Sequence, residues 1–260
     1  MGDVLVLDDL VIEAELPGGG RRRLVDGVGL RLDAGRITVL VGASGSGKTL
    51  TARSLIGLVP VRPGIVNGTL EIAVDGTVHR PLRTGFEGLR GAVVGYLAQD
   101  ARGSLDPLWP IGRQVVEALR LAGRTEDPLP WLRKAGLPDA ERVERLFAHE
   151  LSGGMAQRVA IALALARGSR FLVVDEPTTG LDPSIQEGIL DELLELKAEG
   201  VGVLFITHDL RLVPRLGDQL LVMHAGRIVE DLPTSQLSRI EAPEAVALWK
   251  ATARISGGTL

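Results

Sequence analysis

The sequence of 260 residues contains no cysteine. This absence excludes disulfide bonds, thiolate metal sites and cysteine nucleophiles, and it suits a reducing compartment. Aromatic residues make up only 3% of the chain, and the formal net charge is -4. Proteins that bind nucleic acid usually combine a positive surface with aromatic side chains that stack on bases. The composition therefore predicts no nucleic-acid partner.

Long apolar runs are also missing. No stretch approaches the ~20 apolar residues that cross a membrane as a helix. The first ten residues, "MGDVLVLDDL", are acidic, whereas a signal peptide begins with basic residues. If the protein works at a membrane, we expect it to be peripheral, on the cytoplasmic face, and held there by partners.

Hydrophobic residues make up 45% of the chain, which is enough to bury a full core. Apolar runs of strand length alternate with longer helical patterns, and these runs cover residues 36–42, 92–98, 171–176, 201–207 and 219–223. Such near-continuous apolar runs are typical of strands that are buried on both faces. The sequence therefore predicts an α/β fold with a mostly parallel sheet.

The remaining regions have other patterns. Residues 4–35 and the stretch around Asp75 and Gly76 alternate and turn like antiparallel hairpins, which predicts a small β-lobe. Between residues 100 and 151 the strand pattern disappears. Short helical patterns separated by Gly and Pro predict an inserted helical lobe there. A last hairpin at 222–231 and a helix at 243–254 are expected near the C-terminus.

The stretch "ITVLVGASGSGKT" has the spacing of a phosphate-binding loop between a strand and a helix. Glycines let successive backbone amides turn toward phosphate oxygens, Lys48 would neutralise the β- and γ-phosphates, and Thr49 would ligate Mg²⁺. A plain Gly-rich turn before a core helix is the alternative, but it explains neither Lys48 nor Thr49. We therefore expect nucleotide contacts from Gly42, Ala43, Ser44, Gly45, Ser46, Gly47, Lys48 and Thr49.

The stretch "FLVVDE" places two acidic residues at the end of a predicted buried strand. Ligands bind at the carboxyl ends of strands in open α/β sheets, so Asp175 is expected to hold Mg²⁺ through water. Glu176 is expected to orient and partly deprotonate a water that attacks the γ-phosphate, which favours hydrolysis over phosphoryl transfer. Taken alone, the pair could instead cap the following helix.

A second candidate anion site lies in "HELSGGMAQRVAIALALA". Ser152, Gly153 and Gly154 directly precede a helical pattern, where free amide donors and the helix dipole favour an anion. Ser152 could also serve only as a helix cap.

Six motifs, in their order along the chain, resemble those of the ATP-binding subunits of ATP-binding cassette transporters. "GASGSGKT" is similar to the Walker A motif, Gln99 to the Q-loop, "LSGGMAQR" to the signature, "FLVVDE" to Walker B, "GLD" at 180–182 to the D-loop, and His208 to the switch histidine. The resemblance implies one ATPase domain over residues 1–260. Within it, 1–98 and 159–235 would form the nucleotide-binding core with the β-lobe, 99–158 the helical subdomain, and 236–260 a C-terminal helix and tail.

The resemblance also implies how the site works. Glu176, His208 and Gln99 would be catalytic, and Thr49, Gln99 and Asp175 would hold Mg²⁺ beside ATP. Two subunits would meet head to tail, so that each signature closes over the nucleotide of its partner. The residues expected to act in this way are Ser152, Gly153, Gly154, Gln157 and Asp182. Asp182 could also only cap the helix that starts near Pro183.

"SLDP" after Gln99 and the Met after the signature glycines resemble the oligopeptide, dipeptide and nickel importers, and the length resembles the short nickel-type subunits. This implies an ATP-hydrolysing subunit that powers import of a peptide, nickel or a metal chelate. The expected partners are a second ATPase subunit, either a paralogue or an identical copy, two membrane permeases and, indirectly, an extracytoplasmic solute-binding protein. His79, His149 and His224 are scattered and lack metal-ligand spacing.

Two alternatives remain. A soluble cassette ATPase of DNA repair or translation would usually carry coiled-coil, zinc or tandem-cassette insertions, and the sequence has none of these patterns. A lone P-loop kinase or GTPase explains neither the signature nor His208, and no "NKxD" motif is present.

Two stretches allow more than one interpretation, and the first also departs from the family pattern. The segment upstream of the phosphate loop lacks the aromatic residue that usually stacks on adenine, so Arg21, Arg22 and Arg23 either replace it or form a solvated charge cluster. In "SLDPLWPIG", Trp109 either helps to line a groove for a permease helix or packs inside the helical lobe. Leu105, Leu108 and Ile111 form an apolar group with it that Pro107 and Pro110 interrupt, which predicts an irregular surface or pocket rather than a regular amphipathic helix.

Overall fold

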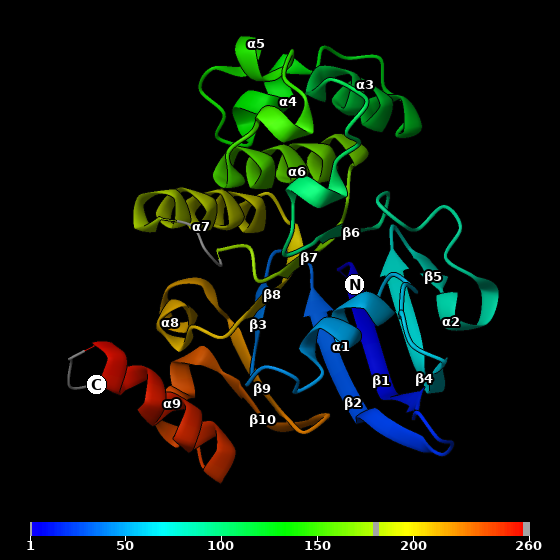
Figure 1. The fold of residues 1–260 in the computed structure, drawn as a ribbon, viewed down its shortest axis with the longest axis vertical. Helices are drawn as coiled ribbons and strands as arrows, with labels where there is room; N and C mark the ends of the chain where they lie inside the picture. The colour runs from blue at the N-terminus through cyan, green and yellow to red at the C-terminus, as the bar shows by residue number, and fades with distance from the viewer. Residues whose placement is uncertain (1, 179–181, 257–260) are drawn as a thin grey trace.

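The computed structural model describes residues 2–178 and 182–256. Its larger sheet has six strands in the order β10-β9-β3-β8-β7-β6 (Figure 1). All strands pair in parallel except β10, which is antiparallel to β9. The five predicted buried strands are confirmed as β3 (Ile37–Val41), β6 (Val94–Leu97), β7 (Phe171–Asp175), β8 (Gly202–Thr207) and β9 (Gln219–His224).

A second, antiparallel sheet has the order β2-β1-β4-β5. Its strands are β1 (Val4–Glu15), β2 (Arg21–Asp33), β4 (Pro63–Val74) and β5 (Thr77–His79). Both predicted hairpins are confirmed, and the second turns at Asp75 and Gly76, which have φ angles of 48° and 77°. Buried side chains of both sheets and of helix α1 (Lys48–Ser54) form one core cluster.

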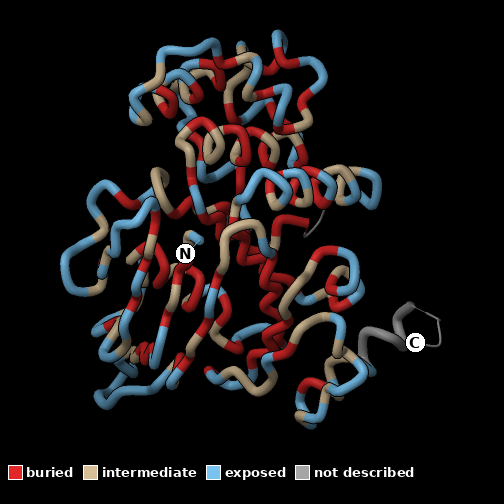
Figure 2. The backbone as a smooth tube through the Cα atoms, turned by 180° about the vertical axis from the view of Figure 1, so that it is seen from behind, coloured by how far each residue is buried: buried red, intermediate tan, exposed pale blue. Residues whose placement is uncertain are grey.

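Helices cover the other side of the larger sheet and extend beyond its end. Helix α6 (Gly153–Arg167) lies under the shorter helices of the lobe, and α7 (Pro183–Ala198) lies next to α6 (Figure 1). The shorter helices of the molecule are α2 (Pro81–Thr84), α3 (Ile111–Leu121), α4 (Leu129–Lys134), α5 (Ala140–Val143) and α8 (Val213–Leu216). Seen from behind, buried residues concentrate in the strands and on the inner sides of these helices (Figure 2). The buried side chains of the lobe helices, of α6 and α7, and of the facing side of the larger sheet form a second core cluster. This core explains why the lobe sequence has apolar residues without strand patterns.

Residues 139–149, one of the short helical patterns expected between 100 and 151, are only partly helical. Their helical parts are α5 and a separate 3-10 turn at Ala148–Glu150. Between them, the carbonyls of Glu144 and Leu146 accept hydrogen bonds from the N–H groups of Gly112 and Ile111 at the start of α3. These tertiary bonds use the backbone groups that a continuous helix would need.

The C-terminal hairpin and helix are confirmed as β9 with β10 (Arg227–Pro233), followed by α9 (Pro243–Ser256). Helix α6 is continuous across residue 158, so one expected subdomain boundary falls inside a helix. The division of the chain into subdomains stays a prediction. Within residues 2–178 and 182–256, no helix combines the length and the apolar character needed to cross a membrane.

Candidate nucleotide-binding site

The phosphate loop connects β3, which is buried along its whole length, to α1. A side chain at Gly42 would place its Cβ 2.2 Å from the carbonyl oxygen of Met223, so only glycine fits there. Gly45 and Gly47 have φ angles of 79° and 111°, which side chains disfavour. Packing against β9 and backbone conformation therefore both require the glycines of the motif.

Lys48 lies beneath this loop and is 6% exposed. Its Nζ donates hydrogen bonds to the carbonyl oxygens of Gly42, at 2.8 Å, and Ala43, at 3.0 Å. Burial lowers the pKa of Lys48, while the nearby carboxylates of Glu176 and Asp175 raise it. The ammonium group thus lies between the loop and the acidic end of β7.

Asp175 ends β7 and is 3% exposed. Its Oδ1 accepts a hydrogen bond from Thr49 Oγ1 at 3.3 Å, and its Oδ2 accepts one from Tyr96 OH at 2.9 Å. Burial raises the pKa of Asp175, and the two hydroxyl donors oppose this effect. Hydroxyl and carboxylate oxygens are ligands that Mg²⁺ prefers, so Thr49 and Asp175 together fit this cation.

Glu176 lies where three strands end side by side. The neighbouring strands β6, β7 and β8 are parallel, so the residues that follow them emerge at one edge of the sheet. Gln99 Nε2 donates to Glu176 Oε2 at 3.4 Å, and His208 Nδ1 lies 3.5 Å from the same oxygen. The structure therefore brings together the three residues predicted to be catalytic. The amide nitrogen of Gln99 faces Glu176, and its contact with Mg²⁺ stays a prediction.

Ser152 caps α6, because its Oγ accepts a hydrogen bond from the N–H of Met155 at 3.2 Å. Ser152 and Gly153 are exposed, whereas Gly154 is packed so that a Cβ there would lie 2.5 Å from Ile185 of α7. Helix α6 lies with the helices of the lobe, whereas α1, which follows the phosphate loop, lies beside the two sheets (Figure 1). The exposed start of α6 is thus available to a ligand from outside this chain.

Gln157 was predicted to join Ser152 in contacting the nucleotide of a partner. It is only 2% exposed, and its Nε2 is buried with no hydrogen-bond partner among the described residues. The side chain thus points into this chain's own interior, and the contact stays a prediction.

Asp182 caps α7. Its side chain accepts hydrogen bonds from the N–H groups of Ser184, at 2.9 Å, and Ile185, at 3.4 Å. A hydrogen bond from the Ser184 hydroxyl, together with these two backbone bonds, lowers the pKa of Asp182. The capping role is confirmed, and the interface role stays a prediction. Gly180 and Leu181 of the same motif lie outside the described residues.

Arg21, Arg22 and Arg23 are exposed at the start of β2. Arg21 and Arg23 form ion pairs with Glu13 at 3.8 and 3.6 Å, and Arg23 also pairs with Asp26 at 2.7 Å. These contacts are those of a solvated charge cluster. Stacking on adenine stays a prediction.

The expected apolar group around Trp109 is not formed as one surface. Leu105 and Ile111 are buried in the core at 5% and 0% exposure, whereas Leu108 is 80% exposed. Trp109 is half-buried, and the guanidinium of Arg113 lies 3.8 Å from the centroid of its ring. Leu105 and Ile111 therefore belong to the core of the lobe, while Leu108 and part of Trp109 remain at the surface, and the irregular surface predicted from Pro107 and Pro110 is confirmed. A hollow of about 550 Å³ lies beside this turn and is lined by Pro110, Gly112, Arg113, Glu144, Arg145 and Phe147.

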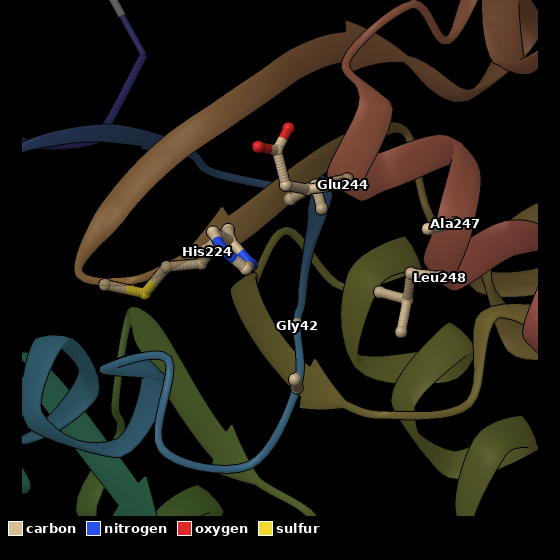
Figure 3. A pocket seen from close by; sticks show the side chains of 8 residues that line it. Gly42, His224, Glu244, Ala247 and Leu248 are labelled. Atoms are coloured by element: carbon tan, nitrogen blue, oxygen red, sulfur yellow. The ribbon is translucent and has the colours of Figure 1, made fainter.

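A smaller pocket of about 280 Å³ lies behind the phosphate loop (Figure 3). It separates Gly42 and Ala43 from helix α9, and the other lining residues are Val222, Met223, His224, Glu244, Ala247 and Leu248. His224 is on β9, while His79 is on β5 and His149 is in the 3-10 turn at 148–150. Within the described part of the chain, no group of three or more His, Cys, Asp or Glu side chains could hold a metal ion.

The model of the family described as "ABC transporter" matches residues 25–179. The chain belongs to the ABC transporter family. It is similar to the nickel import ATP-binding protein NikD of Pseudomonas putida, at 41% identity over 220 residues, which are 82% of this chain and 83% of that protein. It is also similar to the oligopeptide transport ATP-binding protein OppD of Bacillus subtilis, at 37% identity over 87% of this chain and 65% of that protein.

Among solved structures, the chain resembles an "ATP binding subunit of ABC transporter" with a TM-score of 0.73 and 25% identity, over 96% of this chain and 99% of the other. As an ABC transporter ATPase, the protein binds ATP and couples its hydrolysis to transport. The α/β phosphate-loop fold expected from the sequence is confirmed.

Tyr96 also belongs to this site, although the sequence pattern placed it only within the predicted buried strand at 92–98. Burial raises the pKa of Tyr96 to about 12, so the phenol remains protonated at neutral pH. A polar side chain in the otherwise apolar run "VVGYLA", three residues before Gln99, was the available signal.

Proposed function

We propose that this chain is the ATP-hydrolysing subunit of an importer for a small solute. The observation that carries the proposal is the convergence of Gln99 and His208 on Glu176, next to Lys48 and Asp175. A carboxylate held by an imidazole and an amide is suited to orient an attacking water and to take its proton.

The other residues of the loop would bind the phosphates. Lys48 would exchange its two carbonyl partners for the β- and γ-phosphates, since its charge is poorly solvated where it lies. Thr49 and Asp175 would hold Mg²⁺, with Gln99 as a further oxygen ligand. When bound, the cation would neutralise charge on the phosphates as it develops during hydrolysis.

We further propose that the subunit works as a head-to-tail dimer. Ser152, Gly153 and Gly154 are at an exposed helix start, and they would donate to the γ-phosphate bound by the partner subunit, with Gln157 and Asp182 nearby. ATP then favours the closed dimer and ADP does not, so hydrolysis reopens it. The partner would be a paralogue or an identical copy.

The proposed cargo is a peptide, nickel or a metal chelate, because the relatives are named for nickel import and oligopeptide transport. A solute-binding protein would deliver the cargo to two permeases, which would carry it across the membrane. This subunit would bind the permeases at the cytoplasmic face. The hollow beside Trp109 and the exposed Leu108 would receive a short permease helix. No feature of the described residues favours a role in DNA repair or translation.

The hydrolytic role is tested by Glu176→Gln, which keeps the shape of the side chain and removes the base. We expect the ATPase rate to fall about 100-fold or more, with ATP binding retained and the closed dimer trapped. Lys48→Ala should lose ATP binding itself, and Glu87→Gln, at an exposed position, should change neither property. Hydrolysis by Glu176→Gln at the wild-type rate would show that another group is the base.

A further inference from the structure

Tyr96 reaches the ATPase site from a neighbouring strand. It lies opposite Val173 in the parallel pairing of β6 with β7, two residues before Asp175 on that strand. Its hydroxyl donates to Asp175 Oδ2 at 2.9 Å, while Thr49 donates to Oδ1 at 3.3 Å. The Asp175 carboxylate is therefore held from both sides.

A packing role alone does not account for this arrangement. The Tyr96 ring packs against the core between the two sheets, and a phenylalanine could fill the same space. The hydroxyl instead ends on a carboxylate that is 3% exposed, so few waters are available to replace the bond. It is also the only tyrosine in the chain.

We propose that Tyr96 is a positioning residue for the ATPase site, which fixes the orientation of the Asp175 carboxylate toward Mg²⁺ bound with ATP. The inference rests on the proposed Mg²⁺ role of Thr49 and Asp175. Two hydrogen bonds to opposite oxygens restrict rotation of a carboxylate, and partners of this kind commonly support metal affinity. Because Tyr96 is on β6, three residues before Gln99, which follows that strand, it also ties the position of Asp175 to the strand that leads into Gln99.

The test compares Tyr96→Phe with the wild type in two measurements. Mn²⁺ is titrated by electron paramagnetic resonance in the presence of a non-hydrolysable ATP analogue, and ATPase rates are measured across Mg²⁺ concentrations. We expect Tyr96→Phe to weaken Mn²⁺ affinity and to raise the half-saturating Mg²⁺ concentration, each about tenfold. The maximal rate should fall by a smaller factor than the metal affinity. Binding of the nucleotide without a divalent cation should be unchanged.

Two further variants separate positioning from packing. Tyr96→Met also lacks the hydroxyl and should share the weaker Mn²⁺ binding, so the comparison stands even if one variant folds poorly. In an Asp175→Asn background, Tyr96→Phe should add no further loss of Mn²⁺ affinity, since it acts through that carboxylate.

The outcomes distinguish this inference from the function on which it rests. If Asp175→Asn binds Mn²⁺ with the nucleotide as tightly as the wild type does, the proposed Mg²⁺ site fails. If Asp175→Asn loses Mn²⁺ affinity while Tyr96→Phe binds Mn²⁺ like the wild type, only the role of Tyr96 is overturned.

Discussion

Glu176 has a φ angle of 49°, in a region that side chains other than glycine rarely adopt. Such a conformation costs of the order of 1 kcal/mol or more, and it is often found at functional sites. Here the N–H of Glu176 is held by the carbonyl of Ile206 on β8, at 3.0 Å. The carboxylate of this strained residue faces Gln99 and His208, which follow the neighbouring strands β6 and β8.

The arginines at the start of β2 allow a second test at the scale of residues. Because Arg21 and Arg23 already pair with acidic side chains, we expect replacement of Arg21, Arg22 and Arg23 by Ser to change ATP and ADP affinities less than twofold. Nucleotide affinity measured by calorimetry at moderate salt checks this. A parallel loss for ATP and ADP would instead establish stacking on adenine, since neither loss would involve the γ-phosphate.

Among the elements, α6 and α7 are joined by a partly buried ion pair, in which the Glu192 side chain is buried and that of Arg158 is 23% exposed. Arg158 Nε lies 2.8 Å from Glu192 Oε1, and Glu192 Oε2 is buried with no hydrogen-bond partner among the described residues. Gly188 and Gly136 leave the space for these side chains, because a Cβ there would lie 2.3 Å from Arg158 Nη2 and 2.0 Å from Glu192 Oε1. This pair connects the signature helix to the helix capped by Asp182.

Glu192 predicts a pH dependence of stability. Burial raises the pKa of Glu192 to about 7 from 4.5, and Arg158 opposes this effect while Glu195 and Asp191 add to it. The folded protein therefore keeps a proton that the unfolded chain has lost. This contribution to the free energy of unfolding is complete below pH 4.5 and is lost as the pH rises through 7, by about 3 kcal/mol.

Urea unfolding between pH 4.5 and 8 checks this prediction. The free energy of unfolding of Glu192→Gln should lack the loss that the wild type shows between pH 5 and 7.5. Glu195→Gln, one helical turn away and exposed, should retain most of it, because burial is the main cause of the raised pKa and Glu195 only adds to it. Equal pH slopes in the wild type and Glu192→Gln would contradict the assignment.

Trp109 belongs to the turn before α3, and its half-buried ring predicts a moderate effect on stability. Trp109→Ala should weaken co-purification with the permeases while lowering the free energy of unfolding by less than Ile111→Ala does. Ile111 is fully buried, so its truncation should cost about 2–5 kcal/mol. A Trp109→Ala subunit that is strongly destabilised but still binds the permeases when folded would place Trp109 in the core of the lobe.

For the whole molecule, the head-to-tail arrangement predicts complementation between two inactive variants. Ser152→Asp preserves the cap of α6 but adds a negative charge where the partner's γ-phosphate would lie, whereas Ser152→Asn preserves the cap without charge. We expect Ser152→Asp and Lys48→Ala each to be inactive as pure proteins and Ser152→Asn to retain activity.

In an equal mixture of Ser152→Asp and Lys48→Ala, random pairing makes about half of the dimers mixed. Each mixed dimer has one intact site of two, in which the unmodified phosphate loop of one subunit faces the unmodified Ser152 of the other. The mixture should therefore regain roughly a quarter of the wild-type ATPase rate. The measurement is the steady-state rate of the mixture against each parent. A mixture no more active than its parents would rule out sites shared between identical copies.

The sequence determined the features that depend on neighbouring residues. The phosphate loop, the caps at Ser152 and Asp182, and the buried strands were all predicted, because turns, caps and strands are specified by short-range patterns. The resemblance to cassette ATPases implied that Gln99, Glu176 and His208 act together, and the structure places them at one edge of the sheet because β6, β7 and β8 are parallel neighbours.

Only the tertiary structure decided the features that depend on contacts between distant segments. The bond from Tyr96 to Asp175 joins residues 79 positions apart. The ion pair of Arg158 and Glu192 forms only where α6 packs against α7. The break in the helix after Val143 has the same origin, because backbone bonds to α3 replace those of the helix. The contacts of a side chain depend on which elements pack against it, and these elements are often distant in the sequence. A local sequence pattern therefore does not specify its hydrogen-bond or ion-pair partner.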